Sequence, residues 1–439
     1  MKELLSFIRR RGADKLHDIH IGDVDNSILK DEWLTEAQLN HHVHIVGASG
    51  FGKTVLLSRI IEQSIYQSKA VIFIDLKADI ETINSVKAWA RDANREKDLK
   101  FFSISDPSIS THYNLIASGS PTQLRDRIMQ ALTWSEEYYK NQTSSYLLKI
   151  LIGLCYMRDQ TNKRFTLADV YKYSVDQSAV EELCLTIPET AKREREVVES
   201  AIRFISDREN SDSLQGLRNQ LESLLLSEFG SLISVTSTDG ISLFDAIQNN
   251  QIIYFLLDSR RFGETAKSVA RFILQDLKAT SSKIDAEILR EKRKPLRLVI
   301  DEFSDMATED FISFLDRARS SKISVTVAHQ EIADLKKVSE EFAGRLMGNT
   351  STLYAFLQKR PESAELISKI AGTHKVKVRT HQVETVLGMK VRTGNESVKE
   401  VEEFAIHPNV IKSLKVGQAV CIKKYPYALS LKVKVRFAE

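Results

Sequence analysis

The stretch HVHIVGASGFGKTVLL, residues 42–57, decides the fold of this chain. Its first five residues are mostly apolar, as in a buried strand, and apolar residues recur at helical spacing from Thr54 to Gln67. Between them lies GASGFGKT, in which two glycines five positions apart are followed by lysine and threonine. A strand, a glycine-rich turn and a helix in this order predict the start of a parallel α/β sheet.

The glycine-rich turn has the full P-loop pattern, which predicts a site for the phosphates of a nucleotide. Its glycines let backbone amides wrap the phosphates, and the helix that follows adds the positive end of its dipole. Lys53 would reach the β- and γ-phosphates, and the hydroxyl of Thr54 would hold Mg²⁺. An ordinary glycine turn is the alternative, and the flanking strand and helix argue against it. The predicted nucleotide-binding residues are Gly47, Ala48, Ser49, Gly50, Phe51, Gly52, Lys53, Thr54 and Val55.

A second signal is LRLVIDEF, residues 296–303, in which an apolar run leads into two acids. Such a strand delivers Asp301 and Glu302 to the carboxyl edge of the sheet, where ligands of open α/β sheets bind. We expect Asp301 to hold Mg²⁺ through water and Glu302 to polarise the attacking water. Alone, an apolar run followed by two acids is a weak signal, and the P-loop is what makes it specific.

The next apolar run, ISVTVAHQ, ends in Gln330. An amide at the same sheet edge can contact both the γ-phosphate and the attacking water; the alternative is that Gln330 caps the following helix. Arg317 and Arg319 precede this run. Either could complete the nucleotide site of a neighbouring subunit, as in ring-forming P-loop motors, or both could belong to a solvated basic helix end.

A further polar group follows the apolar run Ala70–Asp75. These side chains could assist the phosphates or the metal shell, and the acids could equally bind the loop backbone. The group consists of Asp75, Lys77 and Asp79.

The pattern along the chain changes twice. Residues 119–244 show almost only helical patterns, with Pro121 and Pro188 expected in first turns, and alternating strands and helices resume at about residue 245. The polar stretch Thr380–Val401 predicts a surface loop or hairpin. We therefore predict an α/β fold with a mostly parallel central sheet covered by helices, plus an all-α insertion. The predicted parts are an N-terminal segment (1–40), a nucleotide-binding domain (41–118 and 245–439) and the insertion (119–244).

Composition is typical of a globular protein and excludes several classes. The 439 residues carry a net charge of +3, which permits nucleic-acid binding without requiring it. The three cysteines are far apart, so neither a disulfide framework nor a zinc site is predicted. No apolar run approaches the roughly 18 residues of a membrane span. The basic start, Met1–Arg11, is expected to form a solvated first helix, or else to touch a membrane surface or a partner.

Taken in order, the motifs resemble those of the HerA/FtsK branch of P-loop ATPases, and within it the coupling proteins of type IV secretion and conjugation (the TraD, TraG and TrwB kind). The resemblance covers nearly the whole chain from about Ile19. Leu76 and Ala78 depart from the family's string after the second strand, where it has proline and glycine. The stretches that carry the resemblance are HHVHIVGASGFGKT (41–54), VIFIDLKAD (71–79), HYNLI (112–116), LRLVIDEFSDM (296–306), RARSSKISVTVAHQ (317–330) and KSLKVGQAVCIKKYPYALSLKVKV (412–435).

This resemblance implies a RecA-like motor domain that hydrolyses ATP with Mg²⁺ as a homohexamer and passes DNA, expected to be single-stranded, through a central channel. Arg319 has the family's finger position, eleven residues before Gln330, and Arg317 is the fallback. The implied partners are a relaxase, secretion-channel proteins and a separate membrane anchor, and the implied location is the cytoplasm or the inner face of the cell membrane. The catalytic residues are then Lys53, Glu302, Arg319 and Gln330.

Family coupling proteins begin with membrane-spanning helices, which this sequence lacks. Two alternatives therefore stay open. One is a soluble HerA-like DNA motor in repair or phage defence, acting with a nuclease. The other is a nucleotide-switched adaptor that recruits secretion substrates and hydrolyses little ATP.

Overall fold

The computed structural model describes residues 17–25, 31–386 and 389–438. The chain forms two compact units: unit 1 consists of residues 1–59 and 328–439, and unit 2 of residues 60–327. The predicted helix Met1–Arg11 lies outside the described residues. Within the described ranges, no helix combines the length and the apolar character needed to cross a lipid bilayer.

Unit 2 contains a parallel sheet in the order β8-β7-β4-β6-β5. Its strands are the continuous apolar runs of the sequence, and all residues of β4, β6 and β7 are buried. β8 runs from Ile323 to His329, so its last two residues belong to unit 1. The other strands are β4 (Ala70–Asp75), β5 (Leu99–Ser103), β6 (Ile252–Leu256) and β7 (Leu296–Asp301). The helices of this part are α3 (Lys53–Tyr66, which begins in unit 1), α4 (Ile80–Asp92), α14 (Ser259–Glu287) and α15 (Phe311–Ala318).

Residues 119–244, all of them described, contain helices and no strand, as predicted. Pro121 begins α5, where Ser120 and Gln123 form a capping box. Pro188, expected in a first turn, instead lies in the turn before α9, which begins only at Lys192. The helices are α5 (Pro121–Ala131), α6 (Glu137–Thr161), α7 (Leu167–Val175), α8 (Gln177–Thr186), α9 (Lys192–Ser206), α10 (Arg208–Asp212), α11 (Gln215–Leu225) and α12 (Gly230–Ile233), followed by α13 (Leu243–Gln248).

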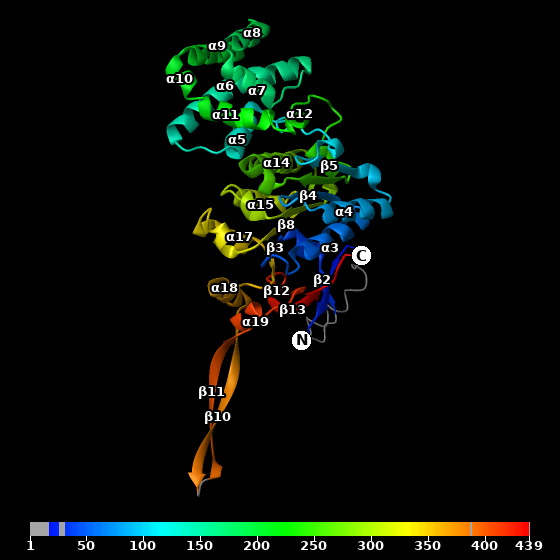
Figure 1. Cartoon of the computed structure of the whole chain (residues 1–439), viewed down its shortest axis with the longest axis vertical. Coiled ribbons are helices and arrows are strands. Elements are labelled where there is room, and N and C mark those ends of the chain that lie inside the picture. The colour runs from blue at the N-terminus through cyan, green and yellow to red at the C-terminus, as the bar shows by residue number, and fades with distance from the viewer. Residues whose placement is uncertain (1–16, 26–30, 387–388, 439) are drawn as a thin grey trace. The chain divides into compact units, whose positions relative to one another are not determined.

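Within unit 2, helices α5 to α12 lie together beyond β5 and α14 (Figure 1). A buried polar group lies where they join the sheet. The hydroxyl of Tyr113 donates to Asp276 on α14 (2.7 Å), and Arg127 on α5 forms a 2.9 Å ion pair with the same carboxylate. The segment that follows β5, the helical region and α14 therefore meet at one buried charge pair.

Unit 1 contains a mixed sheet in the order β2-β1-β13-β12-β9-β3, in which only the β3–β9 pair is parallel among the described ladders of this unit. Its strands are β1 (Ile19–Val24), β2 (Asp31–Leu34), β3 (Val43–Val46), β9 (Thr352–Ala355), β12 (Gln418–Lys423) and β13 (Leu429–Val435). Its helices are α2 (Glu36–Asn40), α16 (Ile332–Leu335), α17 (Glu340–Asn349), α18 (Pro361–Ala371) and α19 (Pro408–Lys412).

Strands β1 and β2 were not predicted, because one contains glycine and the other is only four residues long. Tertiary contacts hold them instead. Glu32 on β2 is 2% exposed and forms a 2.6 Å ion pair with Lys423 on β12, while the hydroxyl of Tyr354 donates to the same carboxylate (3.1 Å). Such a pair is stable only when both partners are present, so it fixes the position of β2.

Strands β10 (Thr373–Val386) and β11 (Met389–Phe404) form a separate two-stranded antiparallel sheet. They project from the rest of unit 1 as a ribbon (Figure 1). This agrees with the hairpin predicted for Thr380–Val401. The strands and helices together confirm the predicted α/β fold with a mostly parallel sheet and an all-α region, while the limits of the domains remain a prediction.

Candidate functional site

The P-loop of unit 1 connects the buried strand β3 to helix α3. The amide of Gly47 donates to the carbonyl of His329 (3.3 Å), and the amide of Ala48 donates to Leu357 (3.0 Å), so the start of the loop is tied to two neighbouring segments. Gly50 and Gly52 have φ values of 81° and 114°, a region that favours glycine. These conformations turn the chain sharply into the first turn of α3.

The tip of the loop offers backbone donors. Ser49 and Gly50 are exposed, and neither makes a hydrogen bond to another described residue. Their amides precede the first turn of α3, whose dipole adds positive potential at this end. Gly47 could not be replaced without a shift, because an added Cβ would lie 2.4 Å from Cβ of Phe356. The start of the loop is therefore packed closely against Phe356, and anion binding at its tip stays a prediction.

Lys53 occupies the first position of α3, and its ammonium is held at the loop. Its Nζ donates to the carbonyl oxygens of Gly47 (2.7 Å) and Ala48 (3.4 Å), and the residue is 6% exposed. The following residue, Thr54, is only half-buried. The ammonium of Lys53 thus lies at the start of the loop, and the roles of Lys53 and Thr54 toward a nucleotide stay predictions.

A buried pair of histidines lies beside the start of the loop. His44 on β3 and His329 at the end of β8 place their Nε2 atoms 2.6 Å apart. Nδ1 of His329 lies 3.0 Å from the carbonyl oxygen of Glu331. A carbonyl only accepts, so Nδ1 carries the proton, and Nε2 of His329 must accept from Nε2–H of His44. Among the described residues, Nδ1 of His44 has no hydrogen-bond partner.

Burial keeps both rings neutral. It lowers the pKa of His329 to about 4, and it holds the pKa of His44 well below its ordinary value, with the neighbouring His329 adding to the effect. Because the carbonyl of His329 accepts from Gly47, this pair links the P-loop to the residue that precedes Gln330. Neither histidine was among the predicted site residues, although a histidine inside an apolar strand such as HVHIV is a signal for a buried polar contact.

In unit 2 the two predicted acids lie at the carboxyl end of β7. Asp301 is 3% exposed and is aligned with Asp75 on the neighbouring strand β4. Its Oδ1 accepts from the amide of Glu302 (2.9 Å), and Glu302 itself has a left-handed backbone with φ 49°. A non-glycine residue in this conformation is uncommon and concentrates at functional sites. Glu302 is half-buried.

The acids after β4 serve the loop itself. The carboxylate of Asp75 accepts from the amides of Lys77 (2.8 Å), Ala78 (3.0 Å) and Asp79 (3.3 Å), and from the hydroxyl of Tyr254 (2.8 Å). Burial raises the pKa of Asp75. Asp79 caps α4. Both acids therefore bind backbone amides, and a role of this group toward phosphates or a metal stays a prediction.

The two candidate arginines lie at the C-terminal end of α15 in unit 2. Arg317 and Arg319 are both exposed. Within the described part of the chain, neither guanidinium makes a hydrogen bond or an ion pair. The structure thus groups the P-loop with Gln330 in unit 1, and the acids and the arginines each have a definite local setting in unit 2.

Comparison with known proteins adds the following. A family model described as Type IV secretory system conjugative DNA transfer matches residues 8–433. The type 4 coupling protein DotL of Legionella pneumophila is 20% identical over 497 residues, which cover 94% of this chain and 63% of DotL. The chain therefore spans less than two thirds of the length of that relative.

Solved structures share the fold at low identity. Unbound TrwBdeltaN70, a bacterial conjugative coupling protein, has a TM-score of 0.67 at 14% identity, with 95% of this chain and 89% of that chain covered. The plasmid coupling protein TrwB in complex with ADP and Mg²⁺ has a TM-score of 0.65 at 14% identity, with 97% and 91% covered. At such identities the likeness concerns the fold alone.

Proposed function

This chain belongs to the type IV secretory conjugative DNA-transfer family, and on that premise we propose that it is an ATP-hydrolysing DNA translocase that acts as a coupling protein in a hexameric ring. The observation that carries the proposal is the P-loop itself. Exposed amides at Ser49 and Gly50 precede a helix whose first residue, Lys53, is held at the loop. This arrangement suits a triphosphate.

The proposed chemistry assigns one role to each group. Lys53 binds the β- and γ-phosphates, Glu302 orients and polarises the attacking water, and Gln330 contacts the γ-phosphate and that water. Thr54 and Asp301 would hold Mg²⁺, directly and through water; a hydroxyl and a carboxylate are the oxygen ligands that this hard cation prefers. The ion would neutralise charge on the phosphates. The TrwB complex with ADP and Mg²⁺ supports this choice of cofactors.

We propose Arg319 as the arginine that completes the site of a neighbouring subunit, with Arg317 as the fallback. An exposed guanidinium that has no partner among the described residues is available to a second chain, where it would stabilise charge on the transferring phosphoryl group. The requirement for a neighbour is what makes the ring part of the proposal.

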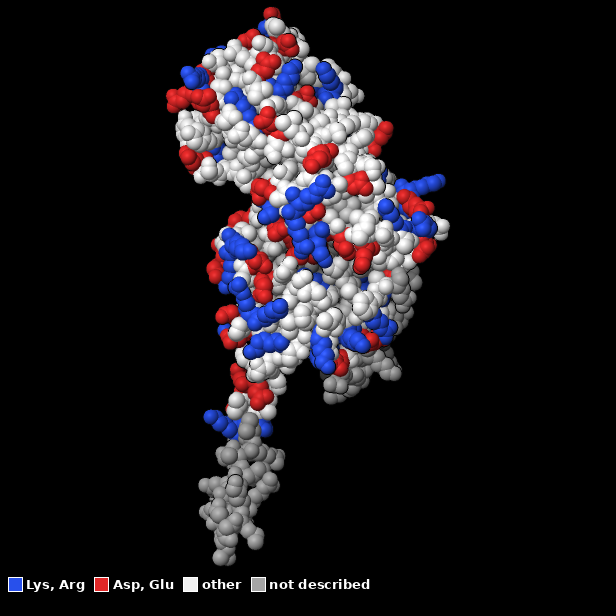
Figure 2. All heavy atoms as spheres, in the orientation of Figure 1, with Lys and Arg blue, Asp and Glu red and all other residues white. Residues whose placement is uncertain are grey.

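The proposed partners are single-stranded DNA, a relaxase, secretion-channel proteins and a separate membrane anchor, at the cytoplasmic face of the membrane. Basic and acidic side chains are interspersed on the face drawn in Figure 2, in keeping with the net charge of +3. We expect the DNA contacts to lie in the central channel.

ATP turnover with and without single-stranded DNA tests the proposal. We expect DNA to stimulate turnover, and Lys53→Ala to abolish both turnover and its stimulation, whereas the matched control Lys415→Ala, an exposed lysine of the same unit, keeps both. Stimulation should rise with protein concentration, because the site needs a neighbour. Negligible turnover that DNA does not change would refute the motor and favour the adaptor.

A trans role for Arg319 has its own test. Arg319→Ala should bind ATP normally and lose turnover, by roughly 10³-fold or more if it supplies the finger. Mixing it with Lys53→Ala chains should restore part of the activity, because some interfaces then hold an intact P-loop and an intact arginine. Loss of ATP binding with no rescue on mixing would contradict the assignment.

A further inference from the structure

The turn that carries the two exposed arginines is a defined structure. It connects α15 to β8 through Lys322, which has φ 58°. The amide of Ser320 donates to the carbonyl of Arg317 (3.0 Å), and the amide of Lys322 donates to that of Arg319 (3.2 Å). The carbonyl of Lys322 in turn accepts from the amide of Leu296, the first residue of β7 (3.0 Å). The turn is thus hydrogen-bonded to the first residue of β7, the strand that ends in Asp301.

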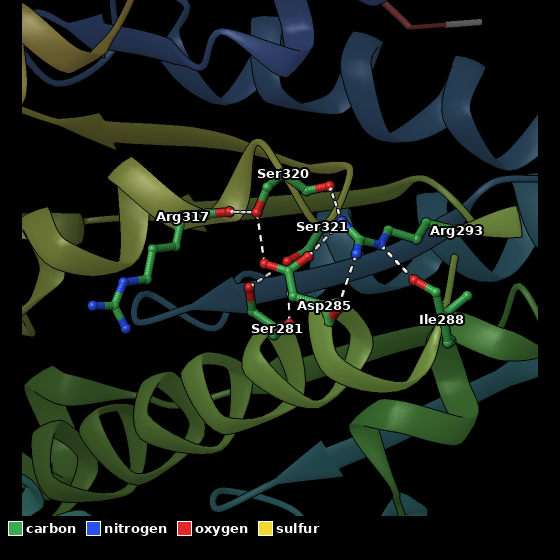
Figure 3. Close-up of polar contacts among 7 residues, drawn as sticks. All are labelled: Ser281, Asp285, Ile288, Arg293, Arg317, Ser320 and Ser321. Carbon is green, nitrogen blue, oxygen red and sulfur yellow. Dashed lines mark hydrogen bonds and ion pairs between the residues drawn. The ribbon is translucent and has the colours of Figure 1, made fainter. Parts of the chain in front are cut away.

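Two oppositely charged residues contact this turn: Asp285, near the end of α14, and Arg293, in the segment between α14 and β7 (Figure 3). We call this pair the bracket. Oγ of Ser320 lies 2.6 Å from Asp285 Oδ2 and 2.7 Å from the carbonyl oxygen of Arg317, and its single hydrogen is donated to one of these two acceptors. Arg293 Nη1 donates to the carbonyl of Ser320 (2.9 Å). The same Nη1 forms a 2.7 Å ion pair with Asp285 Oδ1. The side chain of Ser320 therefore contacts Asp285, its carbonyl accepts from Arg293, and Asp285 and Arg293 form an ion pair with each other.

Besides its contact with the turn, Arg293 is fixed by two hydrogen bonds to the C-terminal end of α14. Arg293 donates from Nε to the carbonyl of Ile288 (2.9 Å) and from Nη2 to the carbonyl of Asp285 (3.0 Å), so all three of its nitrogens are used. Next to it, the hydroxyls of Ser281 and Ser321 lie 2.7 Å apart. Arg293 is 11% exposed and Asp285 is 32% exposed. A planar guanidinium with fixed partners at every nitrogen is a rigid support.

From this geometry we propose that Asp285 and Arg293 are positioning residues for the arginine finger. Arg319 directly precedes the bracketed Ser320, so the bracket sets the point from which its side chain leaves the surface. The inference rests on the proposed function, in which Arg319 acts on the site of a neighbouring subunit. A long side chain that must reach another chain gains most from a fixed base, because small misplacements of a catalytic group can lower a rate by about 100-fold.

Removal of the bracket should lower turnover without weakening nucleotide binding. We expect Asp285→Ala and Arg293→Ala each to reduce kcat by about 10- to 100-fold, with KM for ATP and the affinity for a fluorescent ATP analogue unchanged. Asp285→Asn keeps an acceptor for Ser320 and should recover part of the loss. Glu287→Ala is the matched control, because its side chain lies on the same helix, is 57% exposed and, among the described residues, pairs only with Lys283 at 4.0 Å.

Mixing experiments separate a positioning role from a general folding defect. Asp285→Ala chains retain the P-loop, and Lys53→Ala chains retain the bracketed arginine, so an equal mixture should regain turnover. A mixture of Asp285→Ala with Arg319→Ala should stay inactive, because both chains lack the same function. A misfolded Asp285→Ala chain would be rescued by neither partner.

The outcomes distinguish the inference from the function on which it rests. If Arg319→Ala turns over ATP like the unchanged protein, the finger assignment itself fails. If Arg319→Ala is inactive while Asp285→Ala and Arg293→Ala keep full kcat, only the positioning role fails. Loss of kcat in Asp285→Ala that Lys53→Ala chains do not rescue also overturns it, because the defect then lies outside the finger.

Discussion

Acidification is expected to destabilise this protein through the buried pair of His44 and His329. The pKa of His329 is about 4 in the folded chain and 6.5 in its ordinary state, so the unfolded chain binds a proton that the folded chain excludes. Stability should therefore fall as the pH drops below about 6.5 and level off below about 4. Integrated over this range, the loss is about 2 kcal/mol near pH 5 and about 3 kcal/mol below pH 4. The lowered pKa of His44 acts in the same direction.

The assay is urea denaturation of the unchanged protein and of His329→Gln at about pH 7.5 and pH 5. The amide oxygen of the glutamine can still accept from Nε2–H of His44, so the pair keeps its hydrogen bond while one titrating group is removed. We expect the pH-dependent loss of unfolding free energy to be about 2 kcal/mol smaller in His329→Gln. His41→Gln, at the contact with Tyr425, is the control for removing a histidine.

Carboxylates titrate in both chains, so the difference between them isolates His329. Equal losses in His329→Gln and the unchanged protein would refute the reasoning, as would a gain in stability of the unchanged protein on acidification relative to the variant. A smaller loss in His41→Gln of the same size would also refute it, because the effect would then not depend on burial.

Three further predictions concern unit 1. Glu32→Gln should lower the free energy of unfolding by about 3–5 kcal/mol, because it leaves the charge of Lys423 buried without its partner; the urea midpoint measures this, and an unchanged midpoint contradicts it. Gly47→Ala should cost about 1–3 kcal/mol and weaken nucleotide binding, since its Cβ would lie 2.4 Å from Cβ of Phe356; nucleotide titration and denaturation check both. Gly50→Ala has open space, so only backbone strain of about 1–2 kcal/mol is expected, and a larger loss would show an unseen clash.

The sequence predicted those segments of the candidate site whose residues are consecutive in the chain. The P-loop, the strand ending in Asp301 and the strand before Gln330 are each continuous in sequence, and buried parallel strands appear as apolar runs. The all-α region was equally predictable, because long helices repeat one apolar period. The roles of the individual catalytic residues remain predictions.

Contacts between distant segments explain what the sequence could not predict. Strand β2 depends on Lys423, almost 400 residues away, and no property of DEWL alone announces it. The same holds for the contact between His44 and His329. It also holds for the contacts among Asp285, Arg293 and Ser320, which come from three separate segments. Asp75 shows the opposite case, because the loop amides that it binds lie within four residues, so this contact could be predicted from local sequence.

Helix α14 has a consequence for how motion could pass through unit 2. Its first turn bonds to Asp305 through Ser259, and then Gly263, with φ 53° and ψ −126°, interrupts the helix. Beyond this joint an unbroken rod of about 36 Å carries Asp276 in its middle and Asp285 near its end. A displacement along the axis of this straight part would move Asp276 and Asp285 together, and Gly263 is the position where the first turn beside Asp305 can change its angle to the rest of the helix.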